Sequence, residues 1–127
     1  MDNDELVYSL YEQARRQLED GNPTGAAEVL ELAIEREPAK ASLHEALGRA
    51  YFASSRVEQA RTEFERAAEM NPSDDYAHFG MGRCYERQGR LPEAAKHYKL
   101  ACAMADRADY RTALNRVHQR LDDQAPQ

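Results

Sequence analysis

The sequence predicts an all-α fold: an α-solenoid of three helix-turn-helix units with a C-terminal capping helix, about seven helices in all. The first observation is a pattern that repeats after 34 residues, in which Leu47, Gly48, Tyr51, Ala60 and Phe64 return as Met81, Gly82, Tyr85, Ala94 and Tyr98. The second is helical spacing, because apolar residues within each half of the pattern lie three or four positions apart. A fixed period in this range is the signature of a repeat array.

The spacing has a physical reason in the middle unit. Gly48 and Ala60 are small and fall on the two helices of one hairpin, so these helices can approach closely. The larger Tyr51 and Phe64 then fill the space beside them. Pro72 cannot continue a helix, so the chain turns there into the next unit. One hairpin cannot bury both of its apolar faces, and we therefore expect the hairpins to stack.

Each element has its own start and stop signals. The first helix begins in an acidic lead and ends at Gly21, and Asn22 and Pro23 suit the cap and first turn of the second helix. The turn at Ser55 lacks the usual glycine, which predicts a tighter or more strained connection. The predicted helices end near residue 20 and then run over 23–38, 40–54, 57–70, 74–89, 91–105 and 107–121.

The chain is expected to form one domain over residues 1–127, with repeats at about 7–40, 41–74 and 75–108. The last helix, whose capping portion covers about 109–121, has a single apolar stripe formed by Tyr110, Leu114, Val117 and Leu121, and polar residues on its other faces. A terminal cap needs this combination, and docking of the helix on a partner or membrane is the alternative. The tail at 122–127 is expected to be disordered.

Net charge and hydropathy exclude several classes of partner. The chain carries a formal net charge of -6, which argues against nucleic acid and against anionic membrane surfaces. No apolar run approaches the length of a membrane span. The acidic start, from Met1 to Glu5, does not resemble a secretory signal. A cytoplasmic location follows as the expectation.

The sequence contains no catalytic or metal-binding motif above background. A metalloprotease pattern opens at His44, but the residue four positions later is a glycine instead of the required histidine. His44 and His78 occupy the same place in successive units, where a packed imidazole is expected and a shared pair of metal ligands is the alternative. Cys84 and Cys102 are expected to be buried free thiols. We therefore expect no enzyme, no metal ion and no cofactor.

The repeated residues resemble the tetratricopeptide repeat family over about residues 7–108. The family pattern has Leu-Gly, then Tyr, Ala, Phe and a closing Pro at fixed intervals. The third unit departs from it at Asp106, where Pro would close the unit, and the first has Gln13 and Gln17 in place of Leu and Tyr. The resemblance implies a right-handed solenoid that binds a protein or peptide on its concave face, which the first helix of each unit lines. The second unit matches with His44 in the place of a leading aromatic residue, followed by Leu47, Gly48, Tyr51, Ala60, Phe64 and Pro72.

The concave positions hold two kinds of candidate partner-binding residue. Arg15, Arg49 and Arg83 recur once per unit, and aromatic residues lie near them. Guanidinium groups bind carboxylates through paired hydrogen bonds, and aromatic rings act as anchors with little loss of entropy. Such a surface would suit a peptide with acidic and apolar groups. The candidates are Tyr11, Arg15, Arg49, Phe52, Phe79, Arg83 and Arg87.

Ordinary structural roles compete with this interpretation. Arg15 and Arg49 each follow a glutamate by three or four positions, a spacing that allows an intrahelical ion pair. Tyr11 and Phe79 are equally suited to core packing. Family members that clamp the C-terminal tails of chaperones carry Lys and Asn in these columns, and this chain does not, so binding of chaperone tails is not expected.

We predict a non-catalytic interaction module, of adaptor or scaffold type, that binds a peptide or partner protein on the concave face. The alternative is a structural element that forms a homo-oligomer, because the incomplete first repeat would leave apolar surface for another copy to cover.

Overall fold

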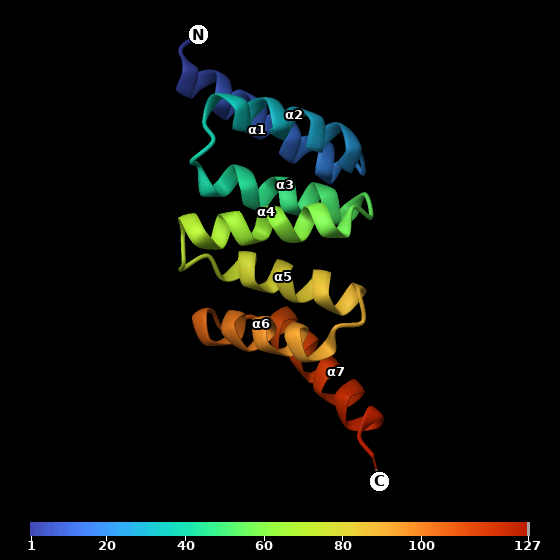
Figure 1. Cartoon of the computed structure of the whole chain (residues 1–127). Coiled ribbons are helices and arrows are strands. Elements are labelled where there is room, and N and C mark those ends of the chain that lie inside the picture. Colours follow the sequence, from blue (N-terminus) through green and yellow to red (C-terminus); the bar gives the residue numbers. More distant parts are fainter. Residues whose placement is uncertain (127) are drawn as a thin grey trace.

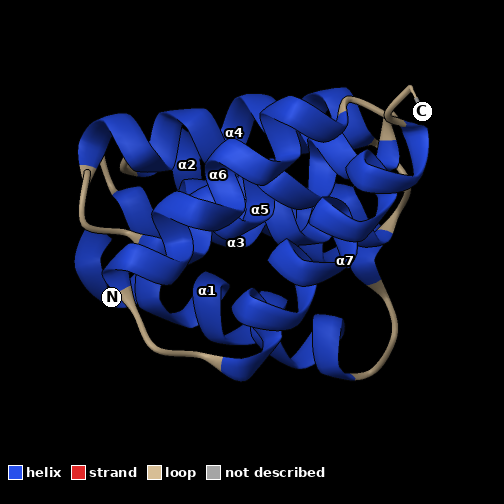
Figure 2. Cartoon of the chain, turned by 90° about the horizontal axis from the view of Figure 1, so that it is seen from below, coloured by secondary structure: helices blue, strands red, loops and turns tan. Residues whose placement is uncertain are grey.

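The computed structural model describes residues 1–126 and confirms an all-α solenoid. Successive helices pair as hairpins, and the hairpins stack along one axis with the last helix packed against the third hairpin (Figure 1). The second helices of the hairpins run along one edge of the molecule in Figure 2. None of the described helices has both the length and the apolar character needed to cross a membrane. The helices are α1 (Asn3–Glu19), α2 (Pro23–Arg36), α3 (Ala41–Ala53), α4 (Val57–Met70), α5 (Asp75–Arg87), α6 (Leu91–Met104) and α7 (Ala108–Gln124).

The turns inside the three hairpins share one backbone conformation. Gly21, Ser55 and Gly89 lie 34 residues apart and have φ values of 78°, 64° and 76°. This left-handed region is costly for a residue with a Cβ atom, so the strain expected at Ser55 is confirmed. The hydroxyl of Ser54 donates a hydrogen bond of 2.8 Å to the carbonyl of Ala50, which helps to close this turn.

The ring of Phe64 from α4 is held between α3 and α5. The side chain is only 2% exposed. A Cβ atom added at Gly48 would lie 2.8 Å from this ring, and one added at Gly80 would lie 2.6 Å from it. The close approach predicted at Gly48 is therefore confirmed. Gly80 provides a second close approach from the next hairpin, and Tyr98 is packed in the same way against Gly82.

His44 is a packed imidazole, as predicted. It is 4% exposed, and both of its ring nitrogens have partners within the chain. Nδ1 lies 2.6 Å from the carboxylate of Glu63, and Nε2 donates to the carbonyl of Pro38 at 2.7 Å. His78 lies elsewhere, with its ring stacked on His97 at a centroid distance of 5.9 Å. His44 has no free nitrogen to share in a metal site with His78.

Helix α7 departs from the prediction in its length and in its buried face. It continues to Gln124, so residues 122–124 of the expected disordered tail are helical. The side chain of Gln119 donates to Asp123 at 3.0 Å, one turn further along, and this contact supports the added turn. Gln127, the end of that predicted tail, lies outside the described residues. The buried residues of α7 are Tyr110, Ala113 and Val117, while Leu114 and Leu121 are half-buried.

Candidate partner-binding groove

Three hollows follow one another along the first helices of the hairpins. The first, of about 80 Å³, lies between α1 and α3; the second, of about 400 Å³, between α3 and α5; and the third, of about 410 Å³, is lined from α3, α5, α6 and α7. Neighbouring hollows share lining residues, so we call them together the groove. Its main lining side chains are Tyr11, Arg15, Leu18, Glu45, Arg49, Phe52, Tyr76, Arg83, Glu86, Arg87, Arg116 and Arg120.

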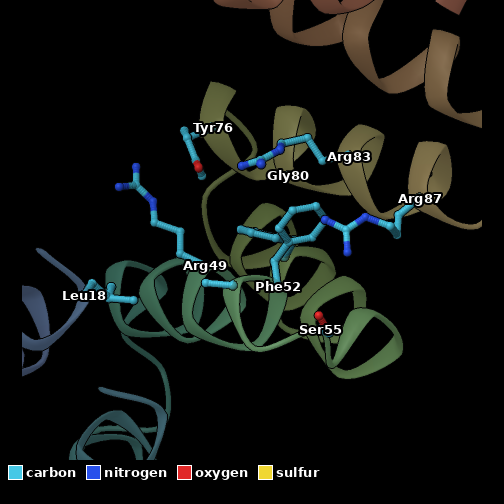
Figure 3. Close-up of a pocket in the computed structure, with 10 residues that line it drawn as sticks. Leu18, Arg49, Phe52, Ser55, Tyr76, Gly80, Arg83 and Arg87 are labelled. Atoms are coloured by element: carbon cyan, nitrogen blue, oxygen red, sulfur yellow. The ribbon is translucent and has the colours of Figure 1, made fainter. Parts of the chain in front are cut away.

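Arginine side chains stack on aromatic rings in the central hollow. The guanidinium carbon of Arg49 lies 3.7 Å from the centre of the Tyr76 ring. Those of Arg83 and Arg87 lie 4.3 Å and 4.6 Å from the centre of the Phe52 ring. Figure 3 shows these side chains converging from α3 and α5. Stacking on an aromatic face holds a guanidinium in place while its hydrogen-bond donors remain available.

The first hollow is narrower, and its charges are paired. Arg15 contacts Glu12 at 3.0 Å, and Arg49 contacts Glu45 at 3.1 Å. Burial, together with the neighbouring Asp74, raises the pKa of Glu45 to about 7. The contacts expected for Arg15 and Arg49 from their spacing are present. Because the raised pKa leaves Glu45 partly protonated near neutral pH, Arg49 is less fully compensated than Arg15.

Helix α7 lines one side of the third hollow, where two of its arginines contact Glu86 of α5. Arg116 donates to both carboxylate oxygens of Glu86 at 2.7 Å, and Arg120 donates at 3.4 Å. The hydroxyl of Tyr98 also donates to Glu86, at 2.8 Å. The hydrogen bonds from Arg116 lower the pKa of Glu86 below its ordinary value, so this carboxylate stays ionised.

Six of the seven predicted site residues line the groove: Tyr11, Arg15, Arg49, Phe52, Arg83 and Arg87. The exception is Phe79, which is 8% exposed and belongs to the core. Its ring stacks on Tyr110 of α7 at 4.6 Å and also contacts Tyr98 at 5.5 Å. Of the two roles expected for Phe79, partner contact and core packing, the structure shows core packing, and the ring holds α7 against the third hairpin.

Some side chains that shape the groove were not among the predicted site residues. Tyr76 of α5 is one of them, and it supports Arg49. Arg116 and Arg120 are two more, because the apolar stripe predicted for the last helix ran through Leu114 and did not include Ala113. Including Ala113 in the stripe shifts the buried face toward both arginines, since they follow it by three and seven positions and so share its side of the helix.

Solved structures with the same fold include several tetratricopeptide repeat proteins. The Arabidopsis OM64 TPR domain superposes with a TM-score of 0.91 and 18% identity, covering 94% of this chain and 99% of that one. The first TPR domain of Spaghetti (RPAP3), bound to the HSP90 peptide SRMEEVD, gives 0.89 and 19%, with 93% and 94% covered. The Yersinia enterocolitica chaperone SycD, in complex with a peptide of the translocator YopD, gives 0.79 and 21%, with 94% and 92% covered.

The family itself is shown by the sequence. No curated protein matches the chain. The tetratricopeptide repeat profile, however, matches residues 11–61 and 45–110, which together span most of the chain and cover all or part of each hairpin. The chain therefore belongs to the tetratricopeptide repeat family.

Proposed function

We propose that this chain is a non-catalytic protein-interaction module, of adaptor or scaffold type, that binds a peptide segment of a partner protein along the groove. The observation that carries the proposal is the central hollow, where Arg49, Arg83 and Arg87 are held against aromatic rings with room of about 400 Å³ beside them. The size suits side chains of an extended or helical segment. Carboxylates of that segment would meet the guanidinium groups, and apolar side chains would pack on Leu18 and Ala53.

Two structural neighbours support a peptide as the ligand. The Spaghetti domain is solved with an HSP90 peptide, and SycD with a peptide of YopD. This chain shares their fold at about 20% identity, so the neighbours support the kind of partner and not its identity. The partner proposed here is a protein with an exposed segment that carries acidic and apolar groups.

The test is affinity capture from the native host's lysate with three forms of the protein. The first is the intact chain, and the second is the groove variant Arg49→Glu/Arg83→Glu. The third is the matched control Lys96→Glu/Lys99→Glu, which makes the same charge change on exposed positions of α6. We expect the intact chain and the control to retain a partner that the groove variant loses, at equal helicity and thermal stability. Retention of the partner by the groove variant would show that the groove is not the binding surface.

A second candidate function is self-association through the first repeat. Tyr8 on α1 is 65% exposed, beside a hollow of about 200 Å³ lined by Val7, Tyr11 and Leu43. An exposed aromatic ring next to an apolar hollow is a contact that another copy would bury. Light scattering over a range of protein concentrations tests this: a mass that rises with concentration, and no longer rises in Tyr8→Ser, would favour self-association over the adaptor role.

A further inference from the structure

The two ends of the groove differ in how their charges are compensated. At the α1 end, Arg15 lies within 4.0 Å of both Glu12 and Glu19, and Arg49 is paired with Glu45. These arginines already have carboxylate partners from their own helices. A ligand carboxylate would have to compete with them there.

At the α7 end, arginines outnumber carboxylates. Arg83 and Arg87 are exposed and form no ion pair with any residue between 1 and 126, although both lie against the Phe52 ring. Arg116 and Arg120 share the single carboxylate of Glu86. Four guanidinium groups and one carboxylate therefore line this hollow, which leaves a formal charge of +3 in a volume of about 410 Å³.

This local charge is opposite in sign to that of the whole chain, which is -6. A long polyanion such as nucleic acid would be repelled by the rest of the surface. A short acidic segment responds mainly to charges within the Debye length of about 8 Å at physiological salt. Charge complementarity therefore favours a peptide segment with clustered carboxylates.

We propose, on the basis of the groove function above, that the α7 end binds an acidic segment of the partner through Arg83 and Arg87, together with the donors of Arg116 and Arg120 that Glu86 does not use. The partner then lies in a fixed direction, with its acidic part against α7 and its apolar part toward the central hollow. Glu86 positions Arg116 through two hydrogen bonds of 2.7 Å and so prepares the site before the ligand arrives. Helix α7 is thus a recognition element as well as a cap.

The test uses a synthetic peptide of four glutamates followed by Leu-Phe as the probe, beside the same peptide with glutamines. Binding is followed by NMR through the Nε–H signals of the arginine side chains, with assignment by single Arg→Lys variants. We expect the glutamate peptide to shift the signals of Arg83, Arg87, Arg116 and Arg120, and the glutamine peptide to leave them unchanged. Shifts confined to Arg15 and Arg49, or equal shifts with both peptides, would overturn the proposal.

Variants separate the contribution of α7 from an effect on folding. Arg83→Gln/Arg87→Gln should weaken binding of the glutamate peptide about tenfold, since two charge-assisted contacts are lost. Arg120→Gln leaves the Arg116–Glu86 contact intact and should weaken binding about threefold without changing helicity. Lys96→Gln/Lys99→Gln is the matched control on α6 and should have no effect.

Two further outcomes distinguish this inference from the proposed function. Inorganic phosphate and a short single-stranded DNA serve as alternative probes, and tighter binding of either one than of the glutamate peptide would overturn the choice of an acidic peptide. If the natural partner is lost with Arg49→Glu/Arg83→Glu but bound equally by Arg116→Gln/Arg120→Gln, the groove function stands and the role of α7 is refuted.

Discussion

The substitution Gly80→Ala tests whether the hairpins are held together by close contact at the Phe64 ring. The added Cβ atom would lie 2.6 Å from two ring carbons and 2.7 Å from a third. The ring has little room to retreat, because it is 2% exposed and Gly48 of α3 is in contact with it as well. One methyl group must therefore be accommodated by strain or by separation of α4 and α5.

Two opposing terms decide the expected magnitude. Inserting a methyl group into a packed core costs about 1–3 kcal/mol. Replacing glycine by alanine inside a helix stabilises the helix by up to about 1 kcal/mol, because alanine has the higher helix propensity. We expect a net loss of about 1–2 kcal/mol in the free energy of unfolding, with a fall in Tm of roughly 3–8 °C for a chain of this size.

Urea unfolding of the intact chain and the variants measures this loss. The difference in stability between Lys99→Gly and Lys99→Ala, on the exposed face of α6, measures the gain in helix propensity from glycine to alanine without any change in core packing. In a Phe64→Leu background the smaller side chain makes room, so the cost of Gly80→Ala should fall by about 1 kcal/mol or more. Stabilisation by Gly80→Ala alone, or an equal cost in both backgrounds, would refute the argument that the ring limits the approach of α5.

Three other predictions concern a turn, a buried pair and a titrating group. Ser55→Gly should stabilise the chain by up to about 1 kcal/mol in urea unfolding, because glycine adopts φ of 64° without strain; a loss of stability would show that the hydroxymethyl group matters more than the backbone. Glu63→Ala leaves Nδ1 of the buried His44 without its partner and should cost about 1–3 kcal/mol, measured in the same way. A loss well below about 1 kcal/mol would mean that water replaces the carboxylate. Burial and the neighbouring Asp74 raise the pKa of Glu45 from 4.5 to about 7 in the folded chain. Between these two pH values the folded state keeps a proton that the unfolded state releases, so the free energy of unfolding should decline as pH rises from about 4.5 to 7. Glu45→Gln cannot titrate and should remove this decline. Identical profiles of stability against pH for the two proteins would contradict the assignment.

The fold follows from the sequence because its signals are local and repeated. The period of 34 residues, the small residue at Gly48 and the closing Pro72 each predict an element that the structure contains. The left-handed turn at Ser55 could also be predicted, since the corresponding positions in the other hairpins are glycines. Helix spacing and turn chemistry act over a few residues, and for this reason they can be read without knowledge of distant contacts.

The roles of individual groove residues follow less completely from the sequence. Arg49 and Arg83 both line the groove, because position in the repeat fixes which side of the first helix a residue occupies. Tyr76 could not be recognised as the support of Arg49, since the two residues belong to different hairpins. The ion pair of Arg15 with Glu12 could be predicted from their spacing in the sequence. Whether Arg83 and Arg87 have a carboxylate partner depends on the neighbouring helices, and within residues 1–126 these helices bring them the Phe52 ring and no paired carboxylate.

The sequence by itself determined the repeat, the order and approximate limits of the helices, and the side of each hairpin on which the arginines lie. Only the tertiary structure decided what happens at the C-terminal end of the array. There α7 packs with Tyr110 against Phe79, which removes Phe79 from the surface, and brings Arg116 to Glu86 in the groove. The physical reason is that a period fixes contacts between equivalent units, whereas α7 has no equivalent. Its angle and rotation are set by side-chain packing between residues about 30 positions apart.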